Sequence, residues 1–108
     1  MGVMGENFRQ QLLEMEEGLR GEKSFSHHAI FGDKKAVLTI VKPMQPKKLQ
    51  VQVFLCEPGR FQEVKRAELL ISYKAKIHAV VKKNSKGFNV AVQAFHGSGK
   101  KEISMKFN

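Results

Sequence analysis

The sequence is poor in the residues that form disulfides, metal sites and catalytic centres. It has one cysteine, Cys56, and therefore no internal disulfide. Its four histidines show no spacing typical of a metal site, and its five acidic residues beyond residue 22 contain no close pair suited to acid–base work. Cys56 also lacks the nearby histidine signature of a nucleophilic enzyme. We therefore expect a protein without enzymatic activity, without a metal and without a cofactor.

Long hydrophobic runs are missing as well. No stretch approaches the roughly 18 apolar residues of a membrane span. The N-terminus has no basic segment followed by an apolar one, so we expect no secretory signal and a cytoplasmic protein. The length of 108 residues predicts a single domain, residues 1–108, and a hydrophobic content of 42% is enough for a folded core.

Acidic residues are scarce outside the first segment of the chain, and the net charge is +9. Five of the ten acids but only two of the nineteen bases lie in residues 1–22, so this segment carries −3 and the remainder +12. A strongly positive body favours a polyanion as its binding partner, such as nucleic acid, an acidic protein or an anionic membrane surface. The alternative is that the positive charge binds no partner and only keeps a small domain soluble.

Arginine is the scarcer of the two strong bases, with four residues against fifteen lysines. Arginine reads phosphates and bases through two parallel hydrogen bonds, whereas lysine acts as a point charge. The excess of lysine therefore indicates electrostatic binding of low sequence specificity.

An amphipathic helix is predicted over residues 7–20, after a loose terminus at residues 1–5. Asn7 is a suitable N-cap and Gly21 a suitable stop. The apolar residues at helical spacing, which we also consider as a partner interface, are Phe8, Leu12, Met15 and Leu19. This helix could cover a sheet, close the mouth of a barrel or pair with a second copy in a homodimer.

Residues 24–107 carry the alternating pattern of β-strands, interrupted by short turns rich in glycine, proline and lysine. The predicted strands are 24–31, 36–41, 49–56, 61–66, 88–95 and 103–107, together with one or more in 67–82. The segment 42–48 holds two prolines and is expected to be an irregular loop. In 57–60, Pro58 and Gly59 occupy the positions that a type II turn requires.

The stretch 67–82 is the hardest to assign. Every odd position from Ala67 to Val81 is apolar, which predicts a strand with one buried face. Sixteen extended residues would span roughly 53 Å, too long for a compact chain of this size. The stretch is therefore one strongly bent strand or two strands broken near 72–75. A helix with its apolar stripe at Leu69, Tyr73 and Ile77 is the remaining alternative.

Together these elements predict an α+β fold that is mostly β: an N-terminal amphipathic helix followed by a six- to seven-stranded antiparallel meander. Short turns between neighbouring strands imply antiparallel pairing. Two architectures fit, a small barrel or a strongly curved sheet wrapped on the helix. We slightly favour the barrel, because it leaves no exposed sheet edges.

The predicted functional site is a lysine-rich strand face with the basic loops beside it. Its members are Lys42, Lys47, Lys48, Lys74, Lys76, His78, Lys82, Lys83 and Lys86. Alternate turns of a meander lie at the same end, so we expect 42–48 and 82–86 to converge with Lys74 and Lys76. Phe54, Phe61, Phe88 and Phe95 are the aromatic residues available for base stacking.

These observations predict a non-enzymatic binding module for an anionic partner, most plainly nucleic acid or a nucleotide. Two alternatives stay open. One is a protein-interaction or adaptor domain that uses the acidic amphipathic helix. The other is a small-ligand barrel whose interior holds Tyr73 and several phenylalanines.

Overall fold

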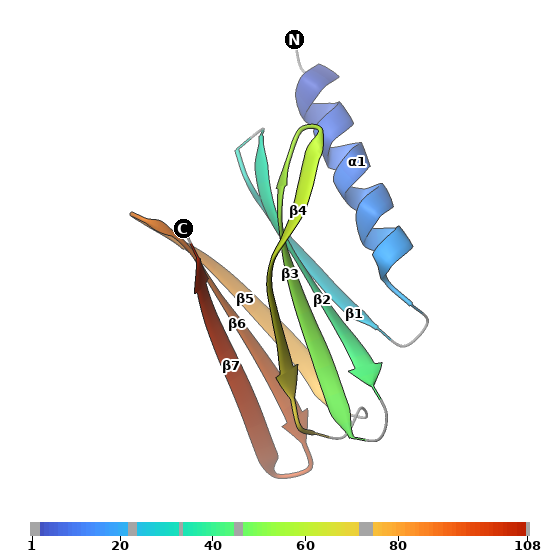
Figure 1. Cartoon of the computed structure of the whole chain (residues 1–108), viewed down its shortest axis with the longest axis vertical. Coiled ribbons are helices and arrows are strands. Elements are labelled where there is room, and N and C mark those ends of the chain that lie inside the picture. The colour runs from blue at the N-terminus through green and yellow to red at the C-terminus, as the bar shows by residue number, and fades with distance from the viewer. Residues whose placement is uncertain (1–2, 22–23, 33, 45–46, 72–74, 108) are drawn as a thin grey trace.

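The structure is a computed structural model that describes residues 3–21, 24–32, 34–44, 47–71 and 75–107. One helix precedes seven strands (Figure 1). The elements are α1 (Val3–Leu19), β1 (Phe25–Phe31), β2 (Lys35–Met44), β3 (Lys48–Glu57), β4 (Arg60–Leu69), β5 (Lys76–Asn84), β6 (Gly87–His96) and β7 (Gly99–Phe107).

The seven strands form two antiparallel sheets in which sequence neighbours pair. The four-stranded sheet has the order β1-β2-β3-β4, and the three-stranded sheet has the order β5-β6-β7. The helix lies on one side of the four-stranded sheet and the three-stranded sheet lies on the other (Figure 1). The fold thus has three layers, and the prediction of one helix followed by an antiparallel, mostly β body is confirmed.

The stretch 67–82 is divided between the two sheets. β4 ends at Leu69 and β5 begins at Lys76, so the two-strand alternative is confirmed, and the single bent strand and the helix are wrong. The favoured barrel is also wrong, because in the described residues no ladder joins β4 to β5 or β1 to β7. The physical reason is the same in both cases: between Leu69 and Lys76 the chain crosses from one layer to the other instead of turning back along β4.

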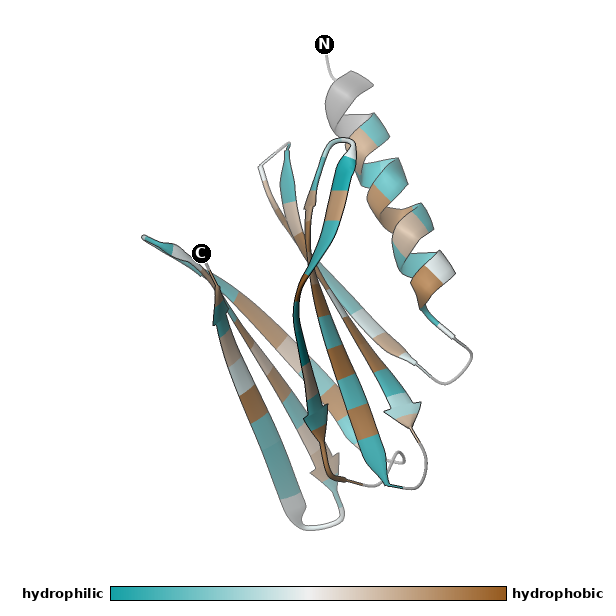
Figure 2. Cartoon of the chain, in the orientation of Figure 1, coloured by the Kyte–Doolittle hydropathy of each residue, from teal (hydrophilic) through white to brown (hydrophobic). Residues whose placement is uncertain are grey.

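The four-stranded sheet separates two hydrophobic clusters, and β3 shows how. Its odd positions (for example Val51 and Val53) point toward the three-stranded sheet, whereas Phe54 and Cys56 point toward the helix. The alternation predicted for 49–56 is therefore confirmed, although both of its faces are apolar at the end of the strand. Figure 2 shows hydrophobic and hydrophilic residues alternating along β3 and β6.

The cluster between the sheets contains Val37, Val41, Leu49, Val51, Val53, Leu69, Ala79, Phe88, Val90, Val92, Ala94 and Met105. The cluster under the helix contains Phe8, Leu12, Ala36, Leu38, Ile40, Phe54 and Cys56. Burial of this apolar surface is the main force that holds the three layers together.

A β-bulge on β4 lets this strand serve both clusters. Val53 pairs with Lys65 and Phe54 pairs with Glu63, so Val64 is an extra residue on β4. An extra residue reverses which face the following side chains occupy. Phe61 accordingly packs under the helix, whereas Ala67 and Leu69 pack between the sheets.

Several element boundaries differ from the predictions: β7 begins at Gly99 rather than at residue 103, and the helix and β2 are also longer than predicted. The helix begins at Val3 rather than after Asn7, since Gly5 lowers helix stability by only about 1 kcal/mol and no proline interrupts the segment. β2 continues through Pro43 to Met44, inside the predicted loop 42–48. Proline is tolerated there because β1 pairs with β2 only as far as Val41, so one side of β2 is a sheet edge at Pro43, while the other side pairs with Leu49 of β3.

Candidate functional site

The three-stranded sheet has one face that no other layer of the described residues covers. Along β6, Phe88, Val90, Val92 and Ala94 are buried against the four-stranded sheet. Because strand side chains alternate, the intervening residues of β6 point to the opposite side. The strand registers extend this side to β5 and β7, and we call it the outer face. Its residues are Lys76, His78, Val80, Lys82, Asn89, Ala91, Gln93, Phe95, Lys100, Glu102, Ser104 and Lys106.

The outer face has a lysine near each of its four corners. At one end, Lys76 on β5 and Lys100 on β7 both pair with Phe95 on β6. At the other end, Lys82 and Lys106 flank Asn89 in the same way. All four lysines are exposed, and the pattern gives the face a strong excess of positive charge.

Glu102 is the one acidic residue of the outer face, and it is held by a neighbour on the central strand. Gln93 Nε2 donates a hydrogen bond of 2.9 Å to Glu102 Oε2. Within the described parts of the chain, the three ion pairs involve His28, Lys48 and Arg66, none of which lies on this face. The corner lysines are therefore left to face solvent.

Phe95 is the aromatic residue of the outer face and is 40% exposed. An open hollow of about 310 Å³ lies beside it, lined by Lys76, Phe95, His96 and Gly97. Gly97 begins the tight turn between β6 and β7 with a φ of +59°, a conformation that favours glycine. The turn thus places a small residue at the wall of the hollow and leaves the ring of Phe95 accessible.

Of the other aromatic residues predicted as stacking candidates, Phe54 and Phe88 lie in the interior and Phe61 is partly buried. Phe54 and Phe88 are 6% and 4% exposed, and Phe88 packs 5.0 Å from the ring of Phe31. Phe61 packs 6.2 Å from Phe8 beneath the helix. Of the four candidates, Phe95 is the most exposed.

The predicted basic residues fall into separate groups. Lys76, His78 and Lys82 lie on the outer face, and Lys74 lies outside the described residues. Lys83 pairs with Phe88, which places it on the opposite side of β5, where this strand extends toward its turn. Lys86 is exposed in that turn, where its backbone N–H donates to Asn84 Oδ1 at 2.9 Å.

The predicted convergence of 42–48 with 82–86 is wrong. Figure 1 shows the β2–β3 turn and the β5–β6 turn at opposite ends of the molecule. The break between Leu69 and Lys76 adds one chain reversal, and this moves the later turn to the other end. Lys47 is exposed at the β2–β3 turn, and Lys48 Nζ lies 3.4 Å from Glu68 Oε2.

The residues predicted as a partner interface cover the chain's own sheet. Phe8 is 2% exposed and Leu12 is fully buried, while Met15 and Leu19 are partly buried in the same cluster. The apolar face of the helix is therefore part of the core. Among the helix residues from Asn7 onward, whose side chains the structure describes, Leu13 is the large apolar residue that remains exposed.

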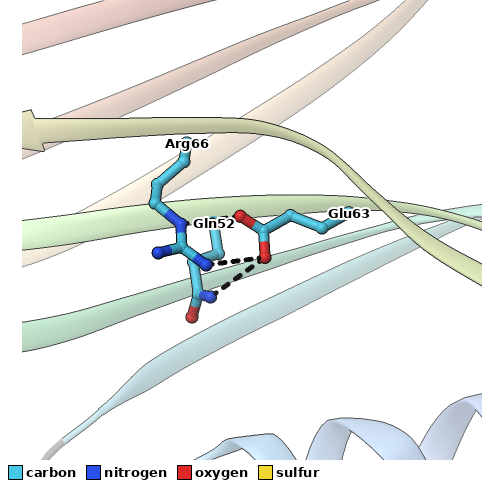
Figure 3. A network of polar contacts seen from close by, with 3 residues as sticks. All are labelled: Gln52, Glu63 and Arg66. Atoms are coloured by element: carbon cyan, nitrogen blue, oxygen red, sulfur yellow. Dashed lines mark hydrogen bonds and ion pairs between the residues drawn. The ribbon is translucent and has the colours of Figure 1, made fainter.

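The helix covers only part of its face of the sheet, and a polar network occupies the neighbouring part (Figure 3). Arg66 donates to both oxygens of Glu63, from Nε at 2.7 Å and from Nη2 at 3.0 Å. Gln52 Nε2 donates to Glu63 Oε2 at 3.3 Å. The hydrogen bond from Arg66 lowers the pKa of Glu63, and the same contact raises the pKa of Arg66. Both side chains stay charged and paired, as expected of a structural contact.

Histidine and cysteine form no reactive cluster in the described residues. His28 Nδ1 lies 2.7 Å from Glu16 Oε1 and links β1 to the helix. His27 points to the other face of β1, where burial and the neighbouring His28 lower its pKa. Burial raises the pKa of Cys56 to about 12, so this thiol stays protonated and unreactive at neutral pH. Within the same residues, no three side chains of histidine, cysteine, aspartate or glutamate are grouped as a metal site would require.

Lys100 and Lys106 belong to the outer face but were absent from the predicted site. The signal that locates them is the alternation of residues 103–107, where Ile103 and Met105 point inward. The even positions must then point outward, which adds Lys100, Glu102 and Lys106 to the face.

Comparison with protein-family models, curated proteins and solved structures finds no match for this chain. In the part of the chain that the structure describes, no helix is long and apolar enough to cross a membrane.

Proposed function

We propose that this protein is a non-enzymatic binding module for an anionic partner, nucleic acid or a nucleotide, and that the outer face is its binding surface. The observation that carries the proposal is the composition of this face, with four exposed lysines at its corners against one glutamate. The opposite side of the same sheet is sealed against the four-stranded sheet, so the binding surface has a rigid support.

Lysine contacts with phosphates release counterions, which makes binding weaker as salt rises. For single strands, the logarithm of the association constant falls with the logarithm of salt by about 0.7 for each phosphate contacted. If the four corner lysines each contact one phosphate, a fourfold increase in salt weakens binding by about 50-fold.

The experiment is a titration of fluorescent oligonucleotides, read by anisotropy, at 50 and 200 mM salt. The test variant is Lys82→Ala with Lys106→Ala, two outer-face residues that flank Asn89. The matched control is Lys34→Ala with Lys65→Ala, two exposed lysines of other elements, which lowers the net charge equally. We expect the test variant to bind more weakly, with a salt slope reduced by about 1.4, and the control to bind like wild type.

Two results would contradict the proposal. If wild type binds no oligonucleotide or nucleotide even at 50 mM salt, the module has another function. If the two double variants weaken binding equally, the net positive charge of the whole molecule drives binding, and the outer face is not the site.

The helix-mediated and small-ligand alternatives have less support from the described residues. The apolar side of the helix is occupied by the sheet beneath it. Between the two sheets, one open hollow of about 230 Å³ lies near Phe25, Val41 and Ile77. This is smaller than the roughly 300 Å³ at which ligand pockets begin, and Tyr73 lies outside the described residues.

A further inference from the structure

We infer that Phe95 is a stacking platform for one unpaired base and that Lys76 and Lys100 bind the phosphates on either side of it, which makes the ligand a single-stranded nucleic acid. This inference rests on the proposed function and names the chemical class of its ligand. It concerns the end of the outer face that adjoins the β6–β7 turn.

The strand register places these three residues in one row across the sheet. Phe95 pairs with Lys76 on one side and with Lys100 on the other. Side chains directly opposite one another on antiparallel strands have Cβ atoms about 4.5–5.5 Å apart. The two lysine side chains therefore begin on either side of the ring, and their length lets both ammonium groups reach the phosphates that flank a base along a nucleic-acid strand.

An exposed phenylalanine alone is ordinary on a protein surface. Phe95 differs because three further features meet at the same place: two lysines of neighbouring strands, the hollow of about 310 Å³, and the turn glycine Gly97 in its wall. A Cβ built on Gly97 would meet no atom within 4 Å, so this side of the hollow is open. The hollow is thus an accessible site that has one aromatic wall and a cation at its rim.

Single strands are favoured over duplexes by the same geometry. In a duplex the bases are stacked on one another and paired, so a phenyl ring that lies on a flat sheet cannot reach their faces. Phosphate contacts alone do not distinguish bases, whereas stacking on an aromatic side chain needs an unpaired base and tolerates any sequence. The excess of lysine over arginine agrees with recognition of that low specificity.

The test compares three ligands of equal length: a labelled single strand, its duplex, and a strand in which every base is removed to leave an abasic backbone. Phe95→Ala removes the ring and Phe95→Tyr keeps an aromatic ring. Leu70→Ala is the matched control, because Leu70 is another exposed apolar residue, 66% exposed, and lies off the outer face. Thermal unfolding of each variant verifies that the fold is kept.

We expect Phe95→Ala to weaken binding of the base-containing strand by about 5- to 150-fold, the range found when a base-stacking aromatic is replaced by alanine. Binding of the abasic strand should be unchanged. Phe95→Tyr and Leu70→Ala should both bind like wild type, and wild type should prefer the single strand to the duplex.

The possible failures are distinguishable. If Phe95→Ala binds base-containing and abasic strands like wild type, or weakens both equally, the stacking inference is overturned while the charge-based function stands. A preference for the duplex overturns it as well. If wild type binds none of the three ligands, the proposed function itself fails.

Discussion

The two sheets of this protein differ in how many of their faces are covered. The four-stranded sheet is covered on one side, in part, by the helix and on the other by the three-stranded sheet. The three-stranded sheet is buried on one side only. The doubly covered sheet contributes to both hydrophobic clusters, whereas the singly covered sheet leaves one face open to solvent.

The burial patterns of the central strands reflect this difference. In β2 the residues from Ala36 to Val41 are all buried, whereas in β6 buried and partly exposed residues alternate. A continuous apolar run is expected where both faces are covered, and alternation where one face meets water. The outer face can therefore carry lysines at no expense to the core.

The largest expected effect concerns the helix that covers the second face of the four-stranded sheet. Leu12→Ala should lower the free energy of unfolding by about 2–5 kcal/mol, since it leaves a cavity at a fully buried site. Leu13→Ala, its half-exposed neighbour, should change this free energy by less than about 0.5 kcal/mol. Urea unfolding measures both. Equal effects would show that the helix does not pack as described.

Next in size are the tight turns, which should respond alike in the two sheets. Gly59 and Gly97 have φ values of +73° and +59°, and neither has an atom within 4 Å of an added Cβ. Replacement by alanine should thus lower stability only through backbone strain, by about 1–2 kcal/mol each. Gly18→Ala in the exposed helix is the control and should stabilise by up to about 1 kcal/mol. If only one of the two alanine variants loses stability, the two turns are not equivalent.

A smaller effect should appear in the pH dependence of stability. His27 lies on β1, and burial and the neighbouring His28 lower its pKa below the usual 6.5 in the folded state. The unfolded chain then binds the proton more readily, so stability should fall as the pH decreases from 6.5 toward the folded pKa. His27→Gln should flatten the curve of Tm against pH between 7 and 5.

Glu63 does not contribute to the change in stability between pH 7 and 5. Its folded pKa lies below the usual 4.5, so the stability that it contributes is present above pH 4.5 and is lost only at lower pH. A His27→Gln curve parallel to that of wild type between pH 7 and 5 would contradict the role assigned to His27.

The smallest effect is expected on the outer face. Lys82→Ala with Lys106→Ala should leave the free energy of unfolding within about 0.5 kcal/mol of wild type, because neither side chain is buried or ion-paired among the described residues. The same double variant should bind oligonucleotides more weakly. A large loss of stability instead would mean that these lysines support the fold, and the contrast between the sheets would disappear.

Part of the site was predictable from the sequence. Alternation placed Lys76, His78 and Lys82 on one side of a strand, and the register of the structure keeps them there. The position of 82–86 was not predictable in the same way, because it depends on whether the stretch 67–82 holds one strand or two. A single added reversal moves every later turn to the opposite end of the molecule.

The aromatic candidates show the same limit. The pattern of the sequence treats Phe54, Phe61, Phe88 and Phe95 alike, since each lies in an alternating segment. Their exposure differs because different layers cover them: the helix covers Phe54 and Phe61, and the second sheet covers Phe88. Phe95 stays accessible because neither layer covers the outer face.

The sequence by itself determined the helix, most of the strands and the strong positive charge of the body. These follow from hydrophobic periodicity and from glycine and proline, which act over a few residues. Only the tertiary structure decided that the strands form two sheets rather than a barrel, that the helix seals one of them, and that four lysines and Phe95 share one uncovered face. The physical reason is that a side chain's exposure depends on which distant layer packs over it, and no local pattern specifies that layer.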